Sequence, residues 1–343
     1  MRASVVAMAA VALGVCGAAQ AQDKTLYVAG YGGSFEQVMR KDVFPAFEKA
    51  NGVKIEYVAG NSTDTLAKLQ AQRGNQQIDV IIVDDGPAYQ AVSLGFCAEL
   101  ASADIYKDVA PVMRFKSNKG VGIGLVGTGF MYNKKVFDEN KWPAPTSWAD
   151  LKDPKFKKKL IVPPINNTYG LHALIAEAEL GGGGVNDIEP GFKAFTGAVG
   201  DNVLVYEPSP SKMTEDFENG QAILAVWGSG RAKAFADTGF PVDFAYPKEG
   251  GYALGVATCP VAGSKNGKEA QAFVQYMLSP PVQIAMATGA GNGPANVTVK
   301  LPPEVAAKVL YGDDIKKVKA VDWDTVNAKR EEWTKRWNRE VER

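Results

Sequence analysis

Residues that could recognise a small molecule are sparse in this sequence, and their types favour binding. Two neighbouring carboxylates, Asp84 and Asp85, follow a continuous apolar run, and Arg231 follows the turn Trp227-Gly228-Ser229-Gly230. A carboxylate supplies the counter-charge for an ammonium group, whereas a guanidinium beside a helix N-terminus can bind a carboxylate or a phosphonate. Together these side chains suit a solute that carries both an amine and an acidic group.

The signatures of catalysis that occur in the chain are incomplete. Gly267-Lys268 is followed by Glu269 and not by the serine or threonine of a phosphate loop, and Ser229 lacks the first glycine of G-x-S-x-G. The stretch 122–127 matches G-x-G-x-x-G, but a predicted strand follows it in place of the helix that would receive a pyrophosphate. The single histidine, His172, has apolar neighbours, which favours a structural or surface role. We therefore expect no enzyme, no cofactor and no metal site.

The composition is that of a globular protein with no excess of either charge. The 343 residues are 46% hydrophobic and 22% charged, and 38 basic side chains balance 38 acidic ones. A nucleic-acid binder would normally carry a basic excess, so we expect no nucleic-acid partner. Three cysteines cannot form a four-cysteine zinc site. The length predicts two domains, each large enough to bury its own core.

Residues 1–21 have the pattern of a secretory signal peptide. One basic residue precedes an apolar run over 5–15, and the Ala-Gln-Ala sequence at 19–21 fits a cleavage site. The run is too short to span a bilayer. The alternative is a lipid anchor on Cys16, which normally requires a small residue where this chain has valine. In the oxidising compartment beyond the membrane, Cys97 and Cys259 either form a disulfide or remain buried thiols.

Strand and helix patterns alternate between residues 25 and 83. Apolar or alternating segments predict strands at 25–29, 53–57 and 78–83. The helix before the second strand begins with an S-x-x-Q capping box formed by Ser34 and Gln37. The segment 78–83 is apolar throughout, which is typical of a strand buried on both faces of a parallel sheet. The chain is therefore predicted to be α/β.

A second α/β unit follows between two glycine-rich boundaries. The boundaries lie at 120–129 and 247–251, and the unit between them alternates apolar strands with helices near 169–180 and 211–219. At the end of the chain, 323–341 sets valines and tryptophans at helical spacing. We interpret this stripe as internal packing, with a partner surface as the alternative.

Several segments together resemble the periplasmic solute-binding proteins of ABC importers, in the branch of the spermidine/putrescine-binding proteins. The similarity runs in order through most of the chain beyond the signal. It is carried by Leu26-Tyr27-Val28-Ala29-Gly30-Tyr31-Gly32-Gly33-Ser34, Phe44-Pro45-Ala46-Phe47-Glu48, Asp79-Val80-Ile81-Ile82-Val83-Asp84-Asp85, Pro145-Thr146-Ser147-Trp148-Ala149-Asp150-Leu151, Trp227-Gly228-Ser229-Gly230 and the segment from Pro241 to Gly251.

This resemblance implies a two-lobed periplasmic-binding-protein fold of type II. Each lobe would be a mixed sheet flanked by helices, with the ligand in the cleft between the lobes. It divides the chain into the signal peptide at 1–21, a first lobe of 22–124 plus 249–298, a second lobe of 125–248, and a C-terminal helical segment, 299–343, that returns to the second lobe. It further implies a periplasmic monomer that delivers a small-molecule ligand to an inner-membrane ABC permease.

The resemblance also indicates which residues would contact the ligand. Aromatic side chains and carboxylates hold polyamines in this branch, but 166–170 and 251–255 supply no acid here. We therefore expect a small amine-bearing, amphoteric or carboxylate solute. The alternatives are a polyamine, namely putrescine or spermidine, or an exported enzyme or sensor subunit on the same fold. The expected ligand-binding residues are Tyr31, Gly32, Gly33, Ser34, Asp84, Asp85, Asn167, Thr168, Tyr169, Trp227, Ser229, Arg231 and Tyr252.

Overall fold

Parallel strands and their connecting helices build the first lobe, as the alternating pattern predicts. The computed structural model describes residues 24–342, so the predicted signal peptide lies outside the described residues. Strand β1 (Lys24–Tyr31) pairs in parallel with β2 (Val53–Gly60) and with β3 (Val80–Asp84). All five residues of β3 are buried, since helices cover both faces of the sheet. The helices around these strands are α1 (Ser34–Val38), α2 (Phe44–Asn51), α3 (Ser62–Ala71), α4 (Asp85–Ser93), α11 (Gly267–Tyr276) and α12 (Pro280–Ala290).

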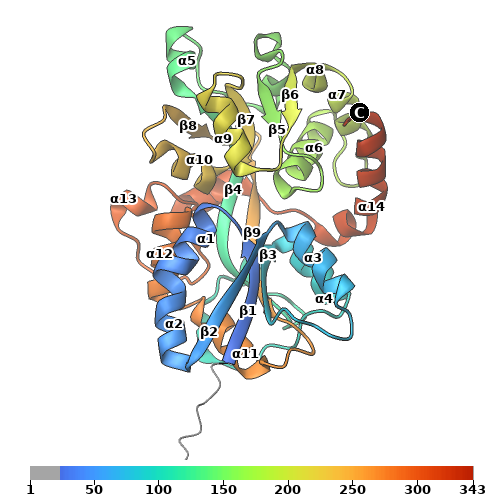
Figure 1. Ribbon diagram of the computed structural model, residues 1–343. Helices are drawn as coiled ribbons and strands as arrows, with labels where there is room; N and C mark the ends of the chain where they lie inside the picture. Colours follow the sequence, from blue (N-terminus) through green and yellow to red (C-terminus); the bar gives the residue numbers. More distant parts are fainter. Residues whose placement is uncertain (1–23, 343) are drawn as a thin grey trace, which may run out of the picture.

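The second lobe is a smaller α/β unit (Figure 1). Its strands are β5 (Leu160–Val162), β6 (Val203–Tyr206), β7 (Leu224–Gly228) and β8 (Val242–Ala245). Its helices are α5 (Lys134–Glu139), α6 (Thr168–Leu180), α7 (Glu189–Phe195), α8 (Ala198–Asn202), α9 (Pro210–Glu218) and α10 (Ser229–Ala236). Strand β5 pairs in parallel with both β6 and β7.

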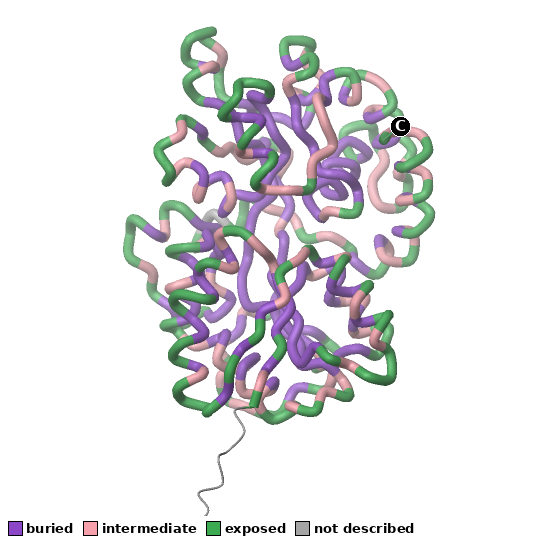
Figure 2. The backbone as a smooth tube through the Cα atoms, in the orientation of Figure 1, coloured by how far each residue is buried: buried purple, intermediate pink, exposed green. Residues whose placement is uncertain are grey.

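Two long strands, β4 (Val121–Asn133) and β9 (Gly251–Pro260), connect the lobes. The first part of β4 pairs with β9, which itself pairs with β3. The last part of β4 pairs with β7 and β8. The strand order is β2-β1-β3-β9-β4-β7-β5-β6, so hydrogen bonding is continuous from one lobe to the other. Figure 2 shows that buried residues follow these central strands through both lobes.

Helix α14 (Trp323–Glu340) lies against both lobes. Near its start, the Asn327 side chain donates a hydrogen bond to the Gly86 carbonyl in α4. Near its end, Arg336 forms an ion pair with Glu189 of α7, and Trp337 packs on Phe195. The predicted tryptophan stripe is thus internal packing. The other short α-helix and strands are α13 (Pro303–Ala306), β10 (Gly293–Pro294) and β11 (Val318–Lys319).

The cysteine alternative is resolved in favour of a disulfide. Cys97, just beyond α4, is bonded to Cys259 of β9, with 5.7 Å between their Cα atoms. The predicted capping box is wrong, because Gly33 occupies the N-cap position and Ser34 is already helical. Gly33 has a φ of 71°, a left-handed conformation that glycine adopts without strain. Within residues 24–342, no helix has both the length and the hydropathy to cross a membrane.

Candidate functional site

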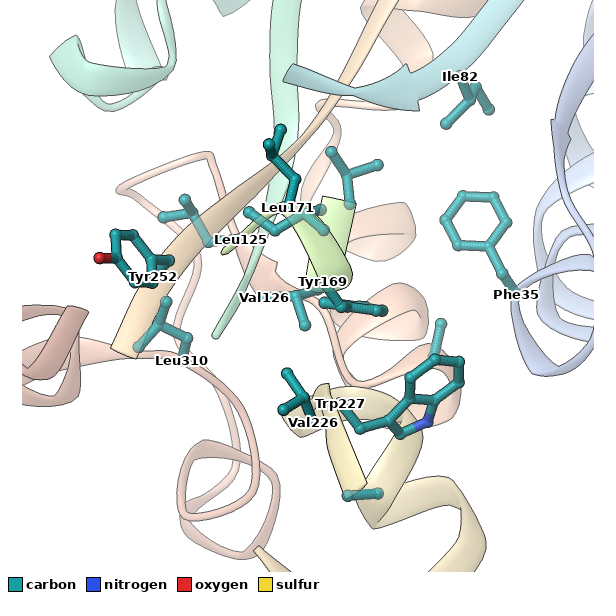
Figure 3. Packing of buried hydrophobic residues seen from close by; sticks show 14 of the residues in the cluster. Phe35, Ile82, Leu125, Val126, Tyr169, Leu171, Val226, Trp227, Tyr252 and Leu310 are labelled. Atoms are coloured by element: carbon teal, nitrogen blue, oxygen red, sulfur yellow. The ribbon is translucent and has the colours of Figure 1, made fainter. Parts of the chain in front are cut away.

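A cavity of about 470 Å³ lies between the two lobes. Its wall combines glycines and serines of the first lobe with aromatic and polar residues of the second. In Figure 3, Tyr169 and Trp227 lie near each other and face Phe35 across the space that they line. Their rings are 5.1 Å apart between centroids. Ligand contacts from both lobes would stabilise a closed arrangement over an open one.

Helix N-termini from both lobes reach this cavity. Asn61, Asn167 and Ser209 occupy the N-cap positions of α3, α6 and α9, and each side chain accepts a hydrogen bond from a backbone N–H of the helix it caps. All three cap residues line the cavity, as does Arg231 in the first turn of α10. The positive ends of the helix dipoles therefore face the enclosed space, which favours a bound anion.

Arg231 adds a full positive charge to this wall. Its guanidinium lies 5.7 Å from the centroid of the Trp227 ring and close to the Tyr169 hydroxyl. Burial raises the pKa of Tyr169 to about 12, an effect that the nearby Arg231 charge opposes. Within residues 24–312 and 315–342, no carboxylate forms an ion pair with Arg231. The guanidinium can therefore still pair with an acidic group of a ligand.

Asp84 is the acidic residue of the cavity wall, and its two oxygens are already engaged. One accepts a hydrogen bond from the Tyr31 hydroxyl at 2.6 Å, and the other accepts one from the Thr168 hydroxyl. The backbone N–H of Asp84 donates to the Ser62 hydroxyl oxygen at 3.0 Å. Burial, followed by the charge of Asp84, raises the pKa of Tyr31 well above its ordinary value, so Tyr31 remains a hydrogen-bond donor.

The cavity brings together most of the ligand-binding residues expected from the sequence. They come from loops and helix starts far apart in the chain, and those on the wall are Tyr31, Gly32, Gly33, Ser34, Asp84, Asn167, Tyr169, Trp227 and Arg231. The expected residues that do not line it are Asp85, Thr168, Ser229 and Tyr252.

Each of these four has a structural reason to lie off the wall. Asp85 lies in the first turn of α4, where its carboxylate accepts a hydrogen bond from the Gly86 N–H at 3.0 Å, and burial raises its pKa to about 7. Ser229 accepts a hydrogen bond from the Gly127 N–H, and Thr168 donates to Asp84. Tyr252 packs on His172, with 5.1 Å between the ring centroids, and lies apart from Trp227 in Figure 3.

The sequence interpretation also missed several residues of the wall. Asn61, Ser62 and Thr63 were recognisable as a helix start, and Ser209 before Pro210 has the same N-cap pattern. Asn292 lines the cavity from the turn after α12, where no local pattern signals a role. Among residues 24–312 and 315–342, no three histidine, cysteine, aspartate or glutamate side chains are grouped so that they could hold a metal ion.

Comparisons with known proteins agree with this architecture. A family model described as "Bacterial extracellular solute-binding protein" matches residues 42–312. The spermidine/putrescine-binding periplasmic protein of Escherichia coli is 24% identical over 332 residues, which is 92% of this chain and 91% of that protein. A putative 2-aminoethylphosphonate-binding periplasmic protein of Salmonella typhi is 34% identical over 117 residues, only 34% of this chain and 32% of that protein.

A solved structure shows the same fold. The crystal structure of an ABC transporter protein from Clostridium perfringens superposes with a TM-score of 0.74 and is 27% identical. The superposition covers 92% of this chain and 99% of that one. The two-lobed arrangement is therefore shared over nearly the whole length of both chains.

Proposed function

The chain belongs to the bacterial extracellular solute-binding protein family, and from this premise we propose that it captures a small solute with an acidic group for an ABC permease. The lobes would close over the solute, and the closed form would deliver it at the inner membrane. In this role the protein catalyses no reaction, because ATP hydrolysis belongs to a separate subunit of the importer. Removal of the signal peptide would release the protein into the periplasm.

The guanidinium of Arg231, which lines the cavity and has no carboxylate partner among the described side chains, is the observation that carries this assignment. An arginine in a partly enclosed, low-dielectric wall is most stable when an anion compensates its positive charge. We infer that a phosphonate, phosphate or carboxylate group of the solute binds Arg231. The N-termini of α6, α9 and α10 add their positive dipole ends to the same space.

The other end of the solute would meet aromatic and hydroxyl groups. Tyr169 and Trp227 can pack on a short carbon chain or on an amine. Asp84 is the acid that lines the described cavity, and two protein hydroxyls already donate to it. A polyamine carries two or more ammonium groups and would need further acids. The arrangement therefore favours an amphoteric solute, and 2-aminoethylphosphonate, named for one of the relatives, is the leading candidate.

Isothermal titration with three related solutes tests the assignment. We expect 2-aminoethylphosphonate and ethylphosphonate, which lacks the amine, to bind, and putrescine, which lacks the acid, to bind at least about a hundredfold more weakly. A bound solute at a hundredfold excess over its Kd also stabilises the fold by about 2.7 kcal/mol, which a thermal-shift assay detects. Tighter binding of putrescine than of both phosphonates would refute the proposal.

A further inference from the structure

We propose that Asp84 is a latch that holds the two lobes closed, and that it is not the counter-charge of a ligand amine. This inference rests on the proposed function, because it concerns closure around the captured solute. Asp84 ends β3 in the first lobe, and Thr168 begins α6 in the second. The hydrogen bond from the Thr168 hydroxyl to the Asp84 carboxylate therefore crosses from one lobe to the other.

The latch is preorganised on the side of the first lobe. Tyr31, at the end of β1, donates to the second oxygen of the Asp84 carboxylate at 2.6 Å. The Ser62 hydroxyl accepts a hydrogen bond from the Asp84 backbone at 3.0 Å. Asp84 and Thr168 are both buried, so little water competes for the bond between them. A charged acceptor held in position makes this crossing bond stronger than one between neutral groups.

A second bond across the lobes reaches the same loop. Thr63 of α3 donates its hydroxyl to the Asn166 carbonyl at 3.1 Å, two residues before Thr168. Arg330 of α14 donates to that same carbonyl at 3.3 Å. Burial lowers the pKa of Arg330, whereas the negative charges of Asp84 and Asp85 oppose this shift. The loop that carries Thr168 is thus held by the first lobe and by α14 together.

The two possible roles of Asp84 differ in whether its effect on binding depends on an amine in the ligand. A counter-charge would matter only for a solute that carries an amine. A latch stabilises the closed state itself. Loss of the latch therefore lowers the affinity for every solute by the same factor, and it shifts the lobes toward the open state even without solute. Because this last effect requires no ligand, the latch can be tested whether or not the proposed solute is the right one.

The first experiment measures the distance between the lobes without solute. Spin labels on cysteines introduced at Lys54 of β2 and Lys135 of α5, both exposed, report opening by pulsed electron paramagnetic resonance. We expect Thr168→Val to shift the distance distribution toward the open state and Thr168→Ser, which keeps the hydroxyl, to restore it. An unchanged distribution in Thr168→Val would overturn the latch.

The second experiment compares ethylphosphonate with 2-aminoethylphosphonate on Asp84→Asn. The latch predicts that both solutes bind about tenfold more weakly, by factors that agree within about twofold. Selective loss of 2-aminoethylphosphonate would overturn the latch and restore the counter-charge role. Failure of the wild-type protein to bind either phosphonate would refute the proposed function. The distance measurement would then still test whether Asp84 and Thr168 hold the lobes closed.

Discussion

Asp85→Asn should make the protein less sensitive to pH. Asp85 is half-buried in the first turn of α4, where it accepts a hydrogen bond from the Gly86 backbone at 3.0 Å and lies against Gly255. Burial, reinforced by the charge of Asp84, raises the pKa of Asp85 from 3.8 to about 7. The folded state therefore binds a proton between these two values where the unfolded state does not. Stability falls as the pH rises through this window.

The size of the effect follows from the width of the window. Each pH unit inside it costs about 1.4 kcal/mol of unfolding free energy. Between pH 5 and pH 8, two pH units lie below the folded-state pKa of about 7, and above that pKa Asp85 is ionised in both states. The wild type therefore loses about 2.7 kcal/mol of unfolding free energy over this range. Because the side chain is half-buried, solvent screening reduces this to about 2 kcal/mol. Asparagine has nearly the same shape and no charge, so it removes this contribution.

Urea unfolding at pH 5 and pH 8, followed by tryptophan fluorescence, measures the difference. The gain in unfolding free energy of Asp85→Asn over wild type should be about 2 kcal/mol larger at pH 8 than at pH 5. Asp104→Asn is the matched control, since the Asp104 side chain is 93% exposed. Buffers without phosphate or carboxylate avoid occupying the cavity. An equal gain at both pH values would refute the burial argument.

Three further variants test the site and the fold. Arg231→Gln should weaken ethylphosphonate binding by about tenfold to a hundredfold in titration calorimetry. The control Arg40→Gln changes an exposed arginine and should leave the affinity unchanged. Equal losses of affinity in the two variants would show that Arg231 does not bind the phosphonate. Gly230→Ala would bring a Cβ within 2.7 Å of the Gly291 carbonyl oxygen at the end of α12. The lobes should then close poorly, so the affinity for ethylphosphonate should fall while the Tm of the solute-free protein stays unchanged. Retained affinity would contradict this reasoning. Replacing both Cys97 and Cys259 by serine should cost about 5 kcal/mol of stability, because the disulfide closes a loop of 162 residues. A Tm within a few degrees of wild type would show that the crosslink contributes little.

The strands and helices were predictable wherever one local pattern decided the outcome. The apolar segment 78–83 could only be a strand buried on both faces, and β3 occupies Val80–Asp84. The capping box failed because a glycine with positive φ supplies the turn before α1, and a short-range motif does not reveal that conformation. Pairing of Cys97 with Cys259 depends on the packing of β9 beside β3, which no spacing in the sequence reports.

Residue types pointed to the site more reliably than to the role of each member. Arg231, which the residue pattern suggested, lines the cavity together with Trp227 and Tyr31, which the resemblance indicated. Asp84 and Asp85 are identical in type, and only the start of α4 decides which one lies on the wall. The hydroxyl of Ser229 is engaged by the backbone of β4, a strand about a hundred residues earlier in the chain. Such long-range hydrogen bonds determine which polar groups remain available to a ligand.

The position of β9 also determines the order in which the lobes can be completed. In the sheet β9 lies between β3 and β4, yet along the chain it follows every strand of the second lobe. A chain that emerges with its N-terminus first must therefore leave β3 with an unpaired edge until residues 251–260 arrive. The second lobe, built from one continuous segment, can finish first. The open edge of β3 is a site for mispairing with other chains, and the arrival of β9 removes it.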